Sequence, residues 1–273
     1  MVRLTCCLAV LVTLLMASSV SAVTLSGFAL ENFSSTGTYS DHVRIIATED
    51  LCDKLSAKIT LTPTKQLPLI SYYEICWNNP GRGVDSVEVG RLFPVFGREW
   101  SDYRVDMAPL LNYSGINGPL VAVDTGISLS GHTRKFGWYT GIFTGDRIFG
   151  NAPGMRGQPD LYLRGTYQTN PTLILGASQR IGPVPASGAD VLITKGRTQV
   201  TLEEINSKGI SQEYAEGEYR LNNLLSVAGR HEWLQSGNRW GAALTLTLPK
   251  GFEVKLLRQT NPNQLFVQAA IRF

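Results

Sequence analysis

The alternation of apolar and polar residues at every second position constrains this chain more than any other feature. In the segment QLFVQAAIRF, the residues Leu265, Val267, Ala269, Ile271 and Phe273 share one side of an extended chain. The residues between them fall on the other side. This period of two is typical of a β-strand with two different faces. Because one face is apolar throughout, it requires a non-aqueous neighbour, which is either a protein core or a lipid bilayer.

Segments with the same alternation recur along the whole chain, and we count 16 candidate strands joined by tight turns such as PKG and NPN. The strands between Asp190 and Ile205 are the least defined, because KGR fits either a turn or the middle of a strand. Counts of 12–14 strands are the alternatives. No long amphipathic helix and no second domain are expected, so the sequence predicts an all-β fold.

The N-terminal residues have the pattern of a secretory signal peptide. Arg3 precedes an apolar run from Leu8 to Met16, and the small residues at 20–22 form a cleavage site. The run is too short for a membrane helix. We therefore expect a signal peptide at residues 1–22 and one domain at 23–273. That domain contains no run of about 18 apolar residues, so it could cross a membrane only as a closed barrel.

The lengths of the connections favour such a barrel. If the last strand runs towards the periplasm, the short turns PKG, GR and GHT are periplasmic, and the two longest connections, 94–119 and 145–159, lie outside. Outer-membrane barrels have this asymmetry. A soluble β-sandwich is the competing architecture. It is disfavoured because nearly every strand has one apolar face and an opposite face with charged residues and threonine. The sequence thus predicts a transmembrane antiparallel β-barrel in the outer membrane.

The polar faces of these strands form the predicted pore lumen. Charge on the lipid side costs roughly 2–4 kcal/mol at the midplane for Arg or Lys, so the charged faces are assigned inward. Acidic and basic side chains are equally frequent there, which predicts weak ion selectivity. The predicted lumen residues are Lys58, Glu74, Glu88, Asp124, Lys135, Arg164, Arg180, Glu216, Arg220 and Arg230, together with Arg44, Glu203, Glu218 and Glu232.

The segments VRIIATEDLCDKLSAKITLTP, YYEICW, VEVGRLFPVFGREW and GWYTGIFTG follow one another in an order that resembles the phosphate-selective-porin-like group of bacterial outer-membrane porins. The resemblance implies a 16-stranded diffusion pore for small hydrophilic solutes or ions, and it admits a homotrimer. This chain is shorter than typical members. It has no cluster of basic residues in one loop, so phosphate selectivity is not carried over.

In the porins that this chain resembles, the third outer loop folds into the barrel and narrows it. Here that loop joins the fifth and sixth strands. The predicted constriction residues are Arg91, Arg98, Glu99, Asp102, Arg104 and Asp106. Their mixed signs predict no single-sign filter, with a slight preference for anions if Arg91, Arg98 and Arg104 reach the constriction. The alternative is that these charges are solvated outside the barrel.

The last strand should pair with the first, VTLSGFALENF, to close the barrel. A C-terminal aromatic is shared by outer-membrane barrels, and we expect Phe273 to be the assembly signal recognised by the barrel-assembly machinery. Membrane lipid is the other expected partner. The formal net charge of +3 gives no electrostatic case for nucleic acid. No cofactor, metal site or catalytic residue is expected.

Two other functions remain open. One is an outer-membrane enzyme of the lipase or protease type, but the histidines His42, His132 and His231 form no metalloprotease pair, and no G-x-S-x-G motif is present. The other is a structural or adhesive barrel with a closed lumen. Cys52 and Cys76 are expected two strands apart, about 10 Å, which exceeds the reach of a disulfide.

Overall fold

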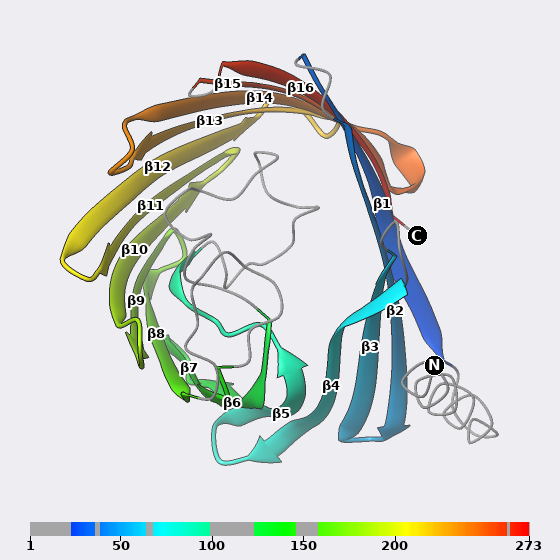
Figure 1. Cartoon of the computed structure of the whole chain (residues 1–273), viewed down its shortest axis with the longest axis vertical. Coiled ribbons are helices and arrows are strands. Elements are labelled where there is room, and N and C mark those ends of the chain that lie inside the picture. Colours follow the sequence, from blue (N-terminus) through cyan, green and yellow to red (C-terminus); the bar gives the residue numbers. More distant parts are fainter. Residues whose placement is uncertain are drawn as a thin grey trace.

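The computed structural model describes residues 23–35, 39–63, 68–98, 123–145, 158–260 and 263–272. In these ranges sixteen antiparallel strands form a single closed barrel (Figure 1). The first eight are β1 (Thr24–Ser34), β2 (Tyr39–Cys52), β3 (Leu55–Pro63), β4 (Pro68–Gly81), β5 (Val84–Leu92), β6 (Asp124–His132), β7 (Phe136–Phe143) and β8 (Asp160–Asn170). The others are β9 (Leu173–Ile181), β10 (Ala186–Lys195), β11 (Thr198–Ser207), β12 (Ile210–Arg220), β13 (Leu225–Trp233), β14 (Arg239–Thr247), β15 (Phe252–Gln259) and β16 (Gln264–Arg272), with a 3-10 turn at Pro249–Gly251.

The barrel closes where the first strand meets the last. β1 pairs with β16 in an antiparallel register that places Phe28 opposite Arg272 and Ser34 opposite Phe266. This confirms the prediction of an all-β barrel with 16 strands, in which the last strand pairs with the first. The smaller counts of 12–14 strands are excluded. The predicted signal peptide at 1–22 and the predicted assembly signal Phe273 lie outside the described residues.

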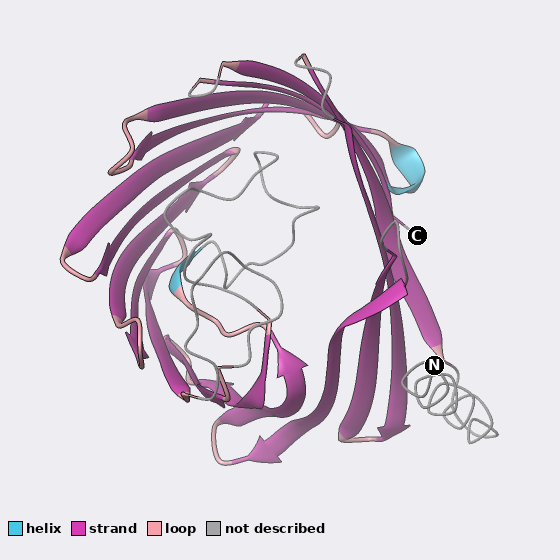
Figure 2. Cartoon of the chain, in the orientation of Figure 1, coloured by secondary structure: helices cyan, strands magenta, loops and turns pink. Residues whose placement is uncertain are grey.

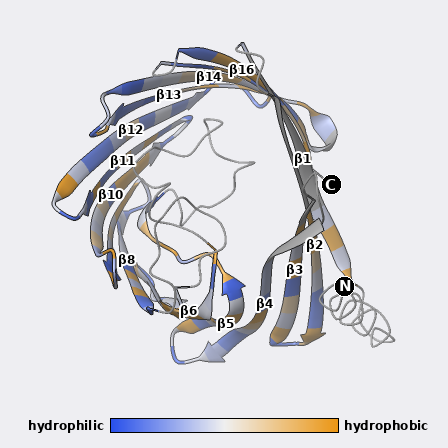
Figure 3. Cartoon of the chain, viewed as in Figure 1, coloured by the Kyte–Doolittle hydropathy of each residue, from blue (hydrophilic) through white to orange (hydrophobic). Residues whose placement is uncertain are grey.

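The outer face of the barrel is apolar, as the alternation predicted. Ile75, Val89, Leu202, Leu256 and Val267 all point outward and are well exposed. Figure 3 shows hydrophobic and hydrophilic residues alternating along the strands. Among the described residues, none of the helical segments is long and apolar enough to cross a membrane.

Exposed aromatic side chains mark both ends of this apolar face. Trp233 and Trp240 flank the connection between β13 and β14. At the opposite end the exposed aromatics are Trp77, Phe136, Tyr167, Tyr219 and Phe252. Two bands of aromatic residues are typical of the two membrane–water interfaces of a transmembrane barrel.

The connections at the two ends of the barrel differ in length. At one end, which we call the short-turn end, the strands are joined by turns such as 53–54, 82–83, 171–172 and 196–197 (Figure 2). The start of β1 and the end of β16 belong to this end, since they adjoin the β2–β3 turn in the sheet order. The long connections 93–123 and 144–159 belong to the other end. This is the asymmetry predicted from the sequence.

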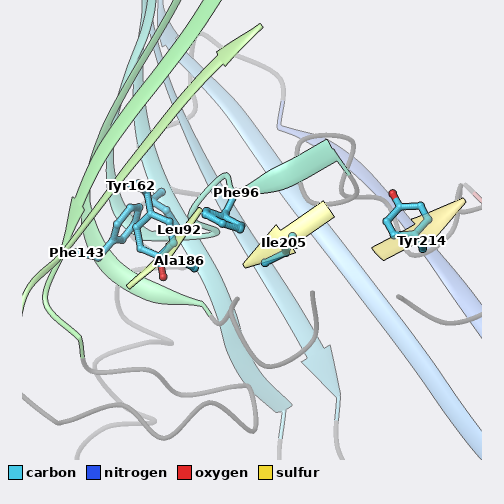
Figure 4. Packing of buried hydrophobic residues seen from close by; sticks show 7 residues of the cluster. All are labelled: Leu92, Phe96, Phe143, Tyr162, Ala186, Ile205 and Tyr214. Atoms are coloured by element: carbon cyan, nitrogen blue, oxygen red, sulfur yellow. The ribbon is translucent and has the colours of Figure 1, made fainter. Parts of the chain in front are cut away.

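The chain enters the barrel directly after β5. Residues 93–98, which we call the inward segment, end in a short helical turn inside the ring of strands (Figure 2). Phe96 is 0% exposed, and it belongs to a cluster with Leu92, Tyr162 and Ile205 (Figure 4). The described start of the third outer connection therefore folds into the lumen, as expected.

Candidate pore lumen

The inward segment is attached to one side of the barrel wall. The backbone N–H of Gly97 donates to Ser178 Oγ on β9 at 3.0 Å, and that of Arg98 donates to Glu203 Oε1 on β11 at 2.9 Å. The ring of Phe96 meets Tyr162 edge-to-face at 6.5 Å between centroids. Two polar anchors and one aromatic contact thus fix the segment against β8–β11. We call the inner face of β8–β11 the anchored wall.

A buried ion pair lies behind the first anchor. Arg164 Nη1 and Nη2 bind the two oxygens of Asp190 at 2.6 and 3.0 Å, a two-pronged geometry that strengthens such pairs. Arg164 Nη1 also donates to Ser178 Oγ at 2.9 Å. Ser178 therefore links the ion pair to the backbone of Gly97, so the inward segment and the wall share one hydrogen-bond network.

A second buried ion pair supports the aromatic contact. Arg180 Nε and Nη2 each donate to an oxygen of Asp160 at 3.1 Å, and neither side chain is more than 1% exposed. The guanidinium carbon of Arg180 lies 5.6 Å from the centre of the Tyr162 ring. Tyr162 in turn packs against Phe96. The position of the inward segment therefore depends on this second pair as well.

Two glycines make room for these carboxylates. A Cβ atom on Gly176 would lie 2.3 Å from an Asp190 carboxylate oxygen, and one on Gly182 would lie 2.0 Å from Asp160 Oδ1. Gly176 pairs directly with Asp190 across β9 and β10. Without side chains at these two positions, the carboxylates can lie flat on the neighbouring strand and still reach their arginines.

The next strands carry a separate charge network. Arg230 on β13 binds Glu216 on β12 at 2.7 Å, and its other terminal nitrogen lies 3.6 Å from Glu232. Glu232 also binds Arg239 of β14. On β15, Lys255 lies 3.6 Å from Glu253. Each charged side chain of this network thus has an opposite charge beside it, which reduces the net charge that the network presents to the lumen.

The opposite side of the lumen is more open. Lys58 on β3 lies 3.4 Å from Glu74 on β4, and its side chain is 35% exposed. The hydroxyl of Tyr72 also donates to Glu74. Glu88 accepts from Ser128 at 3.2 Å. Asp124 instead has a structural role: it accepts from the backbone N–H of Gly145 at 2.8 Å and fixes the start of the following long connection.

A polar hollow of about 530 Å³ opens on the inner face at the short-turn end. It lies over β12–β15 and reaches the turn between β10 and β11 at one edge. Three basic and two acidic side chains line it, together with serine, threonine and asparagine. The charged residues are Arg197, Arg220, Lys255, Glu218 and Glu253.

The structure places two of the predicted site residues, Arg91 and Lys135, differently from the expectation. Arg91 pairs with Tyr73 and Thr125, so the register assigns it to the outer face. The reason is parity: Glu88 and Leu92 point inward, and Arg91 is an odd number of positions from both. Lys135 lies in the turn before β7, where its amino group faces the Thr169 carbonyl oxygen at 3.4 Å.

Other predicted site residues lie on the inner face, where the alternation assigned them. These are Lys58, Glu74, Glu88, Asp124, Arg164, Arg180, Glu216, Arg220 and Arg230. Arg98 belongs to the inward segment. The remaining constriction candidates Glu99, Asp102, Arg104 and Asp106 lie outside the described residues, as does the side chain of Arg44.

Sequence reasoning missed the acidic partners Asp160 and Asp190, and it missed Arg239, Glu253 and Lys255. Alternation carried a usable signal for Asp190, which is two residues from the inward Leu192. Asp160 follows a proline and resembles a turn residue. Which residue faces which across the sheet depends on strand register, and no single strand contains that information.

The described histidines and cysteines lie away from a shared centre. His132 contacts Asp85 at a turn, and the ring of His231 stacks on Trp240 on the outer face at 3.8 Å. Cys52 and Cys76 are free thiols in this structure. No group of three or more His, Cys, Asp or Glu side chains in the described ranges is placed to hold a metal ion.

Comparison with solved structures identifies the fold, whereas comparison with known sequences gives no match. No family model matches the chain, and neither does any curated protein sequence. Among solved structures, a mutant of the porin of Rhodopseudomonas blastica matches with a TM-score of 0.67 and 12% identity over 92% of this chain and 100% of that one. A loop-deletion mutant of OmpT, an outer membrane protein of Vibrio cholerae, matches with a TM-score of 0.61 and 9% identity over 93% of this chain and 99% of that one. These likenesses show the fold, which is a porin-like transmembrane barrel.

Proposed function

We propose that the chain is an outer-membrane porin that forms a water-filled channel for small hydrophilic solutes or ions. The observation that carries this proposal is the inward segment. A stretch of backbone leaves β5 and attaches to Ser178 and Glu203 on the inner wall, inside a barrel with an apolar outer face. A narrowing element with polar anchors suits a pore that selects by size. The porin-like fold supports the same function.

Single-channel recording tests the proposal. The refolded protein is inserted into a planar lipid bilayer, and stable current steps of uniform size are the expected result. A barrel that inserts, shows heat-modifiable gel mobility and yet conducts no current would contradict the proposal. That silence would favour a barrel with a closed lumen, which is the structural alternative.

We propose weak ion selectivity, with a slight preference for anions at most. Arg164, Arg180 and Arg230 are each bound by a carboxylate, so their charges are largely neutralised. Phosphate selectivity gains no support from such a lumen. A reversal potential measured in a salt gradient should lie near zero, and a strong cation preference would overturn this part.

An enzymatic role is not proposed. His132 contacts Asp85 at the short-turn end of β6, and the ring of His231 stacks on Trp240 on the outer face, so the recorded contacts of neither ring include a serine nucleophile. The cleaved signal peptide, the recognition of Phe273 by the assembly machinery and a homotrimer are further parts of the proposal. Loss of heat-modifiable barrel after Phe273→Asp, and a trimer mass in mild detergent, are the expected results.

A further inference from the structure

We infer that the polar hollow at the short-turn end binds small hydroxylated organic anions during their passage, which rests on the proposed channel function. The hollow has about 530 Å³ of space, which is the size of a small-molecule site rather than of a single-ion site. It belongs to the inner face of β12–β15, apart from the inward segment. Arg197, Arg220 and Glu218 in its lining have no ion-pair partner among the described residues, whereas the arginines and aspartates of the anchored wall bind each other.

The arrangement of the lining favours an anion at one edge. Arg220, at the end of β12, is exposed, and within the part of the chain that the structure describes its guanidinium has no carboxylate or hydrogen-bond partner. Arg197, in the adjoining turn, donates to the carbonyl of Leu221 at 2.8 Å and has no ion-pair partner among these residues. Two cations at one edge provide a docking point for a carboxylate.

Hydroxyl groups continue from this edge across the sheet. Arg220 pairs with Ser226, Ser226 with Thr245 and Thr245 with Lys255, so these four side chains form one row over four neighbouring strands. Adjacent strands are about 4.8 Å apart, so Arg220 to Thr245 spans about 10 Å. A solute that places its anion on Arg220 thus extends its hydroxyl groups over Ser226 and Thr245.

An acidic side chain completes the specificity. Glu218 lies two residues before Arg220 on the same face and also lines the hollow. Its carboxylate accepts hydrogen bonds from solute hydroxyl groups and disfavours a second anion nearby. The hollow therefore fits one anionic group joined to a hydroxylated chain. It does not fit a purely apolar anion or a polyanion.

Competition in a planar bilayer tests the inference. Gluconate, hexanoate and sorbitol are added in turn to the side that holds the short-turn end, and the chloride current through single channels is recorded. Gluconate should reduce the current at the lowest concentration, because it alone combines a carboxylate with hydroxyl groups. Equal effects of gluconate and hexanoate would overturn the inference.

Three variants locate the effect. Arg220→Gln should weaken the binding of gluconate about threefold to tenfold, which is the loss expected for one partly exposed charge-assisted hydrogen bond. Thr245→Val should remove the preference for gluconate over hexanoate. Arg134→Gln is the matched control, because it removes the same charge from an exposed turn at the same end, outside the hollow. Identical gluconate affinity in Arg220→Gln and Arg134→Gln would overturn the inference.

The outcome remains separable from that of the proposed function. If no variant conducts, the channel proposal fails, and gluconate binding to the refolded barrel in detergent is then measured by titration calorimetry. Weaker binding to Arg220→Gln than to Arg134→Gln still supports the hollow as a binding site. Absence of binding to the unaltered protein overturns it. If the channel conducts and gluconate has no effect on the current, the porin proposal stands and only the proposed binding site is contradicted.

Discussion

The anchored wall and the polar hollow are built from the same residue types in opposite ways. On β8–β10, arginine and aspartate side chains are fully buried and bind each other in pairs. Around the hollow, Arg220 and Glu218 face open space. Charges that are buried and paired hold the structure, whereas charges that face space remain available to solutes. Inner-face position alone therefore does not identify a residue that acts on the solute.

The largest expected effect comes from breaking one buried pair. Asp190→Ala should reduce the free energy of unfolding by about 3–5 kcal/mol, because Arg164 would be left buried without its carboxylate. Urea unfolding of the refolded barrel measures this loss. Asp85→Ala is the control, since its exposed contact with His132 should contribute less than about 1 kcal/mol.

The same pair permits a sharper version of the test. Replacing both partners, Arg164→Met with Asp190→Leu, should recover much of the lost stability, because no unpaired charge then remains. If Asp190→Ala were as mild as Asp85→Ala, the anchored wall would not depend on its ion pairs. The contrast with the hollow would then disappear.

The second effect concerns the inward segment. Phe96→Ala removes a ring that is 0% exposed, and the lost packing should destabilise the attachment of this segment by about 3 kcal/mol. Since the segment is attached locally, the main consequence is a wider lumen and a larger single-channel conductance. Phe136→Ala, an exposed outer-face control, should leave the conductance unchanged. Equal conductance in the two variants would contradict the narrowing role.

The fold was predictable because the alternation of apolar and polar residues can be seen within a single segment. The site was only partly predictable because the pairing of charged side chains joins strands that are separate in the sequence. The apolar outer face, the strand number and the two kinds of connection all follow from patterns within single segments. The partners of Arg164 and Arg180 depend on register between strands that are far apart in the sequence. Arg91 shows an error of parity, because counting from Glu88 along β5 places it outward.

The third effect tests the space beside Asp190. Gly176→Ala would bring a Cβ within 2.3 Å of the carboxylate, so the pair with Arg164 must shift. Forced shifts of this kind cost roughly 1–3 kcal/mol. Gly217→Ala on β12 is a matched control, since a Cβ there meets nothing within 4 Å. Thermal unfolding should separate the two variants, and equal unfolding temperatures would show that the wall is less tightly packed.

The smallest expected effect lies where an ion pair is half open to the lumen. Lys58 is 35% exposed and lies 3.4 Å from Glu74, so water screens the pair. Lys58→Met should therefore cost less than about 1 kcal/mol of unfolding free energy. Glu74 would still accept the Tyr72 hydroxyl, but its charge would no longer be balanced. The reversal potential should move towards cations. A large loss of stability without a change in selectivity would mean that this pair acts as the buried ion pairs of the anchored wall do. The exposure of a charged side chain would then not show whether it stabilises the barrel or faces the solute.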